Sequence, residues 1–294
     1  MNLRELGEDQ LLQRIAPHLP LNRSVLTGAG DDCAVVQFTG GGNLLLKTDC
    51  VVQGVHFESS ASPSAVGWKA MARPLSDFAA MAGRPEFAMV TLLAPSVTSA
   101  HWVTEAYRGM AKAARMFNVA IVGGETSRLE GPLALSVSLA GSVEKGRAVS
   151  RSGAKAGDNL LVTGRLGGAM RGKHLRFLPR IAEARWLTEH FLINGMMDLS
   201  DGLGTDLPRL ARASGLAFEL DESAVPRTRG CTVEMAISDG EDYELLLAVD
   251  PGSAHSIMRQ WRRKFPKLPL TRIGRLIQGG VVNDQHLAGY VHFK

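Results

Sequence analysis

Apolar residues recur along the chain at two spacings, which predict helices and strands in both halves. A spacing of three and four residues predicts helices, and short apolar runs or alternation predict strands. The segments with helical spacing are residues 3–19, 66–82, 101–117, 181–191, 205–213 and 253–265. The segments with the pattern of strands are residues 33–38, 44–47, 87–93, 119–122, 133–143, 159–163 and 243–249 and the end of the chain. Because both element types mix in each half, we expect the α+β class.

Two local signals refine this pattern. Residues 145–157 are polar and rich in glycine, so we expect two mixed α/β domains, residues 1–145 and 146–294. Pro74 lies inside the helical segment 66–82, where a proline removes a backbone donor and clashes with the preceding turn. We therefore expect that helix to kink or to divide.

The composition is that of a globular protein, with 45% hydrophobic and 21% charged residues among 294. The net charge of +4 is small, and no block of lysine and arginine indicates binding to nucleic acid. The densest basic stretch contains Arg259, Arg262, Arg263 and Lys264, and we expect it to be a solvated helix face. No apolar stretch approaches the ~20 residues of a membrane-spanning helix, so we expect no membrane partner.

The three cysteines, Cys33, Cys50 and Cys231, lie far apart and form no CxxC pair. They indicate neither a zinc site nor a disulfide framework, and a reducing compartment fits them best. The first residues carry several charges in place of a signal-peptide core. The sequence therefore favours a cytoplasmic protein.

Acidic residues lie at the ends of apolar strands and in glycine turns. A carboxylate beside a buried strand is costly unless it is paired, caps a helix or binds a metal. Oxygen ligands of this kind suit magnesium, which takes a few carboxylates and completes its shell with phosphate oxygens and water. The residues in such positions are Asp32, Asp49, Asp77, Glu125, Asp198, Asp201, Glu241, Asp242 and Glu244.

Each of these positions also has a structural explanation when it is taken alone. Asp32 fits a turn or a cap. Asp77 has Arg73 one helical turn away, a spacing at which the two form an ion pair. Asp198 and Asp201 fit caps of the helix that follows them. The residues favour a metal site only jointly, as parts of one family pattern.

Short motifs match that family in its own order. They include Gly-Val-His-Phe at residues 54–57 and Gly-Glu-Asp-Tyr-Glu-Leu at residues 240–245. The other matching segments are residues 28–32, 48–49, 67–70, 75–81, 123–126, 151–154, 198–203 and 289–293. Over nearly its whole length the chain thus resembles the thiamine-monophosphate kinases. These belong to a superfamily with aminoimidazole-ribonucleotide synthetases, hydrogenase-maturation proteins and selenophosphate synthetases.

The resemblance implies a kinase that uses ATP and magnesium to convert thiamine monophosphate to thiamine diphosphate by direct phosphoryl transfer. It also implies a homodimer built through the sheets of the N-terminal domains, and a C-terminal domain that covers the active-site cleft. The implied magnesium ligands are Asp32, Thr48, Asp49, Asp77, Glu125, Asp198 and Asp201. The implied ATP contacts are Gly124, Glu125, Arg151, Ser200 and Tyr107, and the implied contacts to thiamine monophosphate are His56, Glu241 and Tyr290.

The residue types agree with this chemistry. The second pKa of a phosphate monoester is about 6, so the acceptor is largely ionised at neutral pH and needs no strong general base. The sequence has no P-loop and no nucleophile motif of the hydrolase kind. Arg151 suits bidentate contact with phosphate, although without the family a surface arginine is an equal alternative. His56 alone would more often be structural, and Tyr290 alone would fit surface packing.

Five positions and one segment depart from the family pattern. Lys47 stands where serine or threonine is frequent, Glu125 replaces aspartate, Pro74 replaces asparagine, Asp239 replaces glycine and Phe177 replaces proline. The segment between Gly172 and Asp198 is shorter than usual. Two alternatives therefore stay open: a non-catalytic relative that binds nucleotide or thiamine phosphate, and another enzyme of the superfamily. For Lys47 we expect that its ammonium supplies part of the charge of one magnesium ion, because lysine also contacts phosphate.

Overall fold

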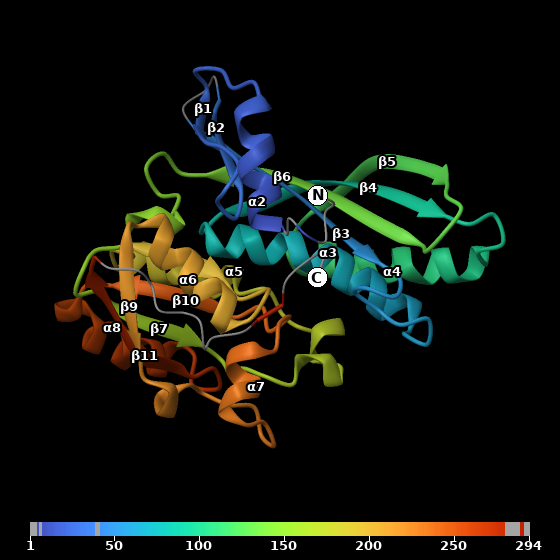
Figure 1. The fold of residues 1–294 in the computed structure, drawn as a ribbon. Helices are drawn as coiled ribbons and strands as arrows, with labels where there is room; N and C mark the ends of the chain where they lie inside the picture. The colour runs from blue at the N-terminus through green and yellow to red at the C-terminus, as the bar shows by residue number, and fades with distance from the viewer. Residues whose placement is uncertain (1–4, 6–7, 39–41, 280–288, 291–294) are drawn as a thin grey trace.

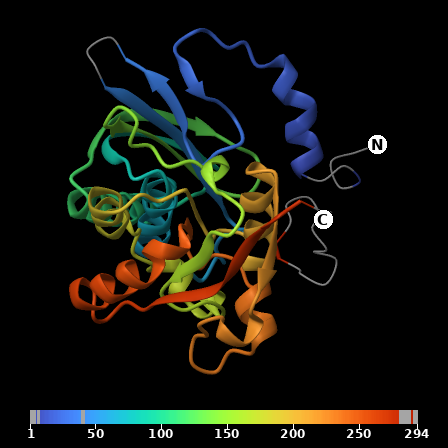
Figure 2. The same ribbon diagram turned by 90° about the vertical axis from the view of Figure 1, so that its left-hand side faces the viewer.

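The chain folds into two β-sheets with a long helix between them (Figure 1). The computed structural model describes residues 5, 8–38, 42–279 and 289–290. The helix α3 (Pro63–Ala80) packs on strands β3 (Asn43–Val52) and β6 (Ala134–Val143) of the first sheet and on β8 (Gly195–Asp198) of the second. In Figure 2 the first sheet, in blue to green, lies above the second, in yellow-green to red. Strands and helices mix in both parts, which confirms the predicted α+β class.

The first sheet has six strands and one parallel pair. Its other elements are β1 Val25–Thr27, β2 Ala34–Gln37, β4 Arg84–Ala94, β5 Ala120–Arg128 and the helix α4 Ala100–Met116. The strand order is β1-β2-β3-β6-β4-β5, and all neighbours are antiparallel except β4 and β5. The helix α4 joins that parallel pair, because parallel strands need a long crossover connection.

Side chains of β3 alternate between the two faces of the first sheet. Leu45 is fully buried on the face that packs on α3, whereas Leu46 is exposed on the opposite face. The same alternation places Lys47 and Asp49 on the side of α3, and Thr48 on the opposite side. The strand thus delivers two charged side chains to the space between the sheets.

Apolar side chains remain exposed on the face of the first sheet that points away from α3. Leu46, Phe87, Met89 and Val122 are all at least 42% exposed, and they line a hollow of about 380 Å³. We call these four residues the open face.

The second sheet is antiparallel throughout. Its other strands are β7 Asn159–Thr163, β9 Leu216–Leu220, β10 Leu245–Val249 and β11 Leu270–Gln278, and its helices are α5 Ile181–His190, α6 Leu203–Ala213, α7 Val233–Ser238 and α8 Pro251–Lys264. The strand order is β8-β10-β7-β11-β9. Buried Leu161 and Leu247 of this sheet belong to the same core as Leu45 and Phe78, so the two parts of the chain share one hydrophobic core.

Most of the expected elements are present within a few residues of their expected ends, and β7 has the expected bounds. The apolar pattern missed β1, β8, β9 and α7, which span three to six residues each. Segments this short contain too few positions to reveal a period. The helix expected at residues 3–19 corresponds to α2 (Glu8–Ile15), and part of that range lies outside the described residues. Residue 146 falls between β6 and β7.

The helix α3 runs through Pro74 without being divided, so of the two outcomes expected there, a kink or a division, the division was wrong. A proline inside a helix costs about 3 kcal/mol, because one backbone hydrogen bond is lost. Fourteen residues of α3 are buried between the sheets and α4, and this packing offsets the local cost. Among the described residues, no helix has the length and apolarity to cross a membrane.

Candidate active site

Three buried aspartates from distant parts of the chain meet between the two sheets. Asp32 precedes β2, Asp77 lies on α3 and Asp198 ends β8. One carboxylate oxygen from each lies within 4.8 Å of the others, and none of the three residues is more than 6% exposed. Like charges this close and this buried repel each other strongly unless a cation accompanies them. We refer to these three residues as the aspartate cluster.

The protein itself compensates the aspartate cluster only in part. The Lys47 Nζ lies 2.7 Å from Asp77 Oδ1, and the Arg151 guanidinium donates to Asp32 Oδ1 at 2.5 Å. Asp198 receives no lysine or arginine ion pair among the described residues; it accepts a hydrogen bond from the Ser76 hydroxyl at 2.5 Å. Two cations therefore serve three carboxylates.

The shifted pKa values of the cluster report the same shortage of positive charge. Burial and the neighbouring Asp32 raise the pKa of Asp198 to about 7. Burial, opposed by Lys47 and helped by Asp49 and Asp198, also raises the pKa of Asp77. A divalent cation relieves such strain by replacing the protons. Buried oxygen donors with excess negative charge are the donor set that magnesium uses, so these residues fit that ion.

Of the other predicted magnesium ligands, Asp49 lies beside the aspartate cluster and Asp201 lies farther from it. Asp49 interacts with Asp77 and faces Arg73, and the charges of Lys47 and Arg73 lower the pKa of Asp49 although burial opposes them. Asp201 lies apart in an ion pair with Arg209.

Thr48 and Glu125 do not reach the aspartate cluster in this chain. The Thr48 hydroxyl lies on the opposite face of the sheet, 3.1 Å from the Ser138 hydroxyl. Glu125 is exposed on β5 and accepts a hydrogen bond from the Ser127 hydroxyl at 3.0 Å. Neither side chain could ligate an ion held by the cluster without a change in structure.

The predicted ATP contacts are also spread over several elements. Arg151 is held inside the site, since its backbone N–H donates to Asp31 and its side chain to Asp32, so a surface arginine is not the explanation. Tyr107 is half-buried on α4 and packs on the core. At Gly124 an added Cβ would lie 1.7 Å from the Val90 carbonyl oxygen, so close pairing of β4 and β5 requires glycine there.

A small cavity contains the three residues predicted to contact thiamine monophosphate. It has a volume of about 130 Å³, and His56, Glu241 and Tyr290 line it together with Ser200 and Asp201. The backbone holds Glu241 and Tyr243 at φ values of +66° and +51°, a conformation that only surrounding structure can enforce in these residues. We refer to this cavity as the substrate pocket.

Three residues of this region were not predicted as site residues: Lys69, Arg73, which the sequence analysis considered only as an ion-pair partner of Asp77, and His174. Lys69 is fully buried and forms an ion pair with Glu241, while its Nζ donates to the His56 carbonyl at 2.6 Å. His174 Nδ1 lies 3.4 Å from Glu241. The signal for two of them was present, because Lys69, Arg73 and Asp77 are spaced by four residues and so share one face of α3.

Glu241 stays ionised in this setting. Burial alone would raise its pKa, but His174, Lys69 and Arg73 lower it to about 2. The pocket therefore keeps a negative charge at neutral pH.

The other two acids of the Gly-Glu-Asp-Tyr-Glu-Leu motif have structural partners. Glu244 accepts hydrogen bonds from Arg180 at 2.7 and 2.8 Å, and from the Thr163 hydroxyl at 2.9 Å. Asp242 accepts one from the Gly167 N–H at 2.7 Å, and Lys173 lies 3.1 Å from it. These contacts tie segments of the second sheet together and leave Glu241 alone to face the substrate pocket.

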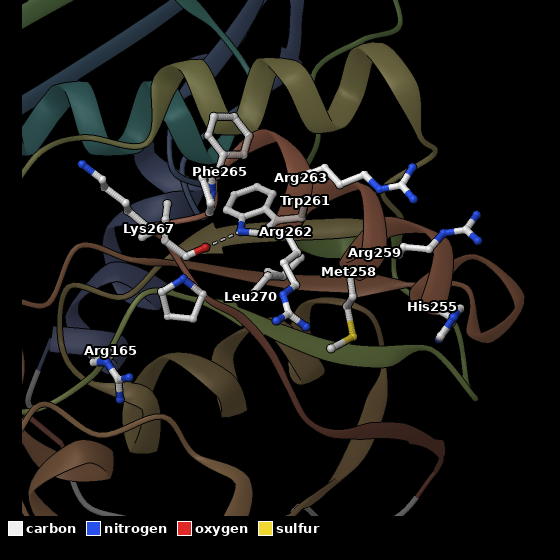
Figure 3. A pocket seen from close by; sticks show the side chains of 13 residues that line it. Arg165, His255, Met258, Arg259, Trp261, Arg262, Arg263, Phe265, Lys267 and Leu270 are labelled. Carbon is white, nitrogen blue, oxygen red and sulfur yellow. Dashed lines mark hydrogen bonds between the residues drawn. The ribbon is translucent and has the colours of Figure 1, made fainter.

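A larger hollow of about 970 Å³ lies elsewhere, over α8 and the start of β11 (Figure 3). Its polar lining is basic, with Arg259, Arg262 and Arg263 exposed along the helix as expected from the sequence. It contains no carboxylate, so it lacks the acidic oxygen donors that magnesium uses.

Comparison with known proteins gives the class to which this fold and site belong. Residues 30–143 match the model of the AIR synthase related protein N-terminal domain, and residues 141–285 match the model of the C-terminal domain. Among characterised relatives, the thiamine-monophosphate kinase of Rhodopirellula baltica is 37% identical over 86% of this chain and 84% of that protein. The thiamine-monophosphate kinase of Aquifex aeolicus is 33% identical over the full length of both.

A solved structure, AaThiL complexed with AMPPCP and TMP, is similar over 99% of both chains, with a TM-score of 0.85 and 32% identity. Sequence and fold thus agree along the whole chain. The protein belongs to the thiamine-monophosphate kinase family.

Proposed function

We propose that this protein transfers the terminal phosphoryl group of ATP to thiamine monophosphate, giving thiamine diphosphate and ADP. The observation that carries the proposal is the adjacency of two sites of different chemistry. The substrate pocket, with ionised Glu241, borders Asp49 and the aspartate cluster through Arg73. The related structure AaThiL was solved with AMPPCP and TMP, which supports the same pair of ligands for this chain.

The transfer forms a bond between an oxygen of the acceptor phosphate and the γ-phosphorus of ATP, and breaks the bond from that phosphorus to the β–γ bridging oxygen. The main obstacle is repulsion between two anions, so positioning and charge neutralisation provide the catalysis. Magnesium, held by Asp32, Asp77 and Asp198 with Asp49 beside them, would supply that neutralisation. Lys47 and Arg151 already contribute fixed positive charges at the same place.

The residues of the substrate pocket suit the thiamine end of the acceptor. The ionised Glu241 attracts the thiazolium cation, and Tyr290 offers an aromatic ring for the same charge. His56 is held by the Val52 N–H, which donates to its Nδ1 at 3.1 Å, and by Lys69 at its carbonyl. These contacts fix the wall of the pocket on which the ring system would rest.

For ATP we propose contacts to Gly124, Glu125, Arg151, Ser200 and Tyr107. Arg151 is the best placed of them, because its guanidinium already lies against Asp32. Glu125 and Thr48, which lie away from the aspartate cluster, are proposed as metal or nucleotide contacts only in an assembled dimer. Asp201 is proposed as a ligand that releases Arg209 when an ion binds.

We further propose a homodimer that buries the open face of each chain. Leu46, Phe87, Met89 and Val122 provide apolar area for such an interface, and β5 brings Glu125 to its edge. We propose residues 1–145 and 146–294 as the two domains, with the division between β6 and β7. The cytoplasm is the proposed location, supported by three free cysteines.

The test is formation of thiamine diphosphate by the purified protein with ATP, magnesium and thiamine monophosphate. The expected result is stoichiometric conversion that depends on all three components. Binding of both ligands without turnover would instead identify a non-catalytic relative. ATP consumption without thiamine diphosphate would identify another enzyme of the superfamily.

A further inference from the structure

Arg73 lies between the substrate pocket and the aspartate cluster. It projects from α3 into the pocket lining, and its Nη2 is 3.5 Å from Asp49 Oδ1. Its side chain is only 13% exposed. The residues one turn before and one turn after it, Lys69 and Asp77, are paired with Glu241 and Lys47 respectively. Arg73 is thus the middle member of a charged helix face, and its ion pair with Asp49 is the longest of the three.

Two of the three guanidinium nitrogens of Arg73 have no hydrogen-bond acceptor in the described part of the chain. These are Nε and Nη1, and both are buried from solvent. A buried polar group without a partner destabilises the folded protein, and more so when the group is charged. The long contact with Asp49 serves only the third nitrogen. Buried donors left without a partner in a native protein call for an explanation, and a bound ligand is one.

The geometry points to a specific partner for these nitrogens: we propose that Arg73 binds the phosphate group of thiamine monophosphate and so positions it for transfer. The inference rests on the proposed function, since it concerns the acceptor of that reaction. Guanidinium nitrogens form a planar fork that matches two phosphate oxygens. Among the described residues that line the substrate pocket, Arg73 is the one lysine or arginine.

The place of Arg73 along the pocket agrees with the shape of this acceptor. Glu241, His56 and Tyr290 suit the cationic ring system, whereas Arg73 leads from the pocket toward Asp49. A thiamine monophosphate molecule held by its rings at Glu241 would therefore direct its phosphate to the guanidinium and to the aspartate cluster beyond. The arginine would also reject thiamine itself, because its N–H groups stay unpaired when the phosphate is missing.

The experiment compares the Kd of thiamine monophosphate and of thiamine by calorimetry, with a chelator present and without nucleotide. Under these conditions only the protein's own cations contact the phosphate. We expect wild type to bind thiamine monophosphate at least tenfold more tightly than thiamine. In Arg73→Gln the ratio of the Kd for thiamine to the Kd for thiamine monophosphate should fall to about one, while the Kd for thiamine is unchanged. Arg259→Gln, in the basic hollow of Figure 3, is the matched control and should keep the wild-type ratio.

Arg73→Lys keeps a positive charge beside Asp49. If Arg73→Gln no longer binds thiamine, Arg73→Lys tests whether the guanidinium binds the phosphate group. Its ratio should fall severalfold, because an ammonium cannot form the two-point contact. In turnover assays both variants should raise the KM for thiamine monophosphate and leave the KM for ATP unchanged. An unchanged ratio in either folded variant would overturn the role of Arg73 and leave the proposed function standing. Failure of wild type to bind either compound would overturn both.

Discussion

Two groups of buried carboxylates lie in this molecule, and they differ in how far the protein compensates their charge. Glu244 is surrounded by Arg180, Lys173 and a threonine hydroxyl, whereas Asp242 has Lys173 and a backbone N–H, and burial still raises the pKa of Asp242 to about 6. Asp198, by contrast, has a serine hydroxyl and two neighbouring aspartates. Both groups lie in motifs of the same family, and both are almost fully buried.

The difference indicates that the role of a carboxylate in a motif, in the fold or in the chemistry, depends on its partners rather than on its residue type. A compensated carboxylate has its charge balanced by ion pairs and hydrogen bonds within the protein, so its removal leaves those partners unpaired and should damage the fold. In the aspartate cluster two cations serve three carboxylates, which leaves room for a further cation, so the removal of a carboxylate at this site should damage the chemistry. Substitutions in the two groups should therefore have opposite consequences.

The largest effect is expected for Asp77→Asn and Asp49→Asn. Each change removes one carboxylate charge from the site, and turnover should fall by about 100-fold or more if both hold magnesium. Circular dichroism and size-exclusion chromatography should show a folded protein. Normal turnover at normal magnesium would remove these residues from the site.

A loss of stability is expected instead for Glu244→Gln. The change leaves Arg180 and Lys173 without their shared carboxylate, and the free energy of unfolding should fall by about 3 kcal/mol. Denaturant titration measures this loss, and turnover of the protein that remains folded should be near that of wild type. Glu219→Gln is the matched control, because its pair with Arg275 is exposed and its removal should leave stability unchanged.

A dependence of stability on pH should distinguish the aspartate cluster in the metal-free protein. The folded-state pKa of Asp198 is about 7, above its ordinary value of 3.8. Between these values the folded state binds more protons than the unfolded state, so stability decreases as pH rises toward 7. The melting temperature of chelator-treated protein should fall across this range, and magnesium should restore it most at high pH. In Asp198→Asn the slope should become shallower; the same slope in that variant would contradict the assignment.

The smallest effect is expected for Lys47→Thr. Lys47 lies against Asp77, with its pKa raised by Asp77 and Asp49 although burial opposes them, so it is a permanent cation in the site. If it stands in for part of an ion, the variant should require severalfold more magnesium or depend on it more steeply. Counting bound manganese by electron paramagnetic resonance should give a higher number than in wild type. Lys145→Thr, at an exposed lysine, is the control, and a magnesium titration shared by all three proteins would refute the idea.

Much of the fold could be predicted because long elements repeat their pattern many times. The helix α4 and the strand β6 were located closely in this way. The placement of Thr48 could also have been corrected from the sequence alone, since neighbours in a strand face opposite sides and Asp49 faces α3. The pair of Lys47 with Asp77 could not, because thirty residues separate them and the contact depends on how α3 crosses β3.

We propose that the aspartate cluster serves phosphoryl transfer, whereas Glu244 and Asp242 stabilise the fold. The most direct test measures the transfer of phosphorus-32 from γ-labelled ATP to thiamine monophosphate in the presence of magnesium. It compares wild type, Asp77→Asn and Glu244→Gln. Label should appear in thiamine diphosphate with wild type and, at a temperature where it is folded, with Glu244→Gln, whereas folded Asp77→Asn should transfer almost none. Absence of transfer by wild type, or equal transfer by wild type and Asp77→Asn, would contradict the account.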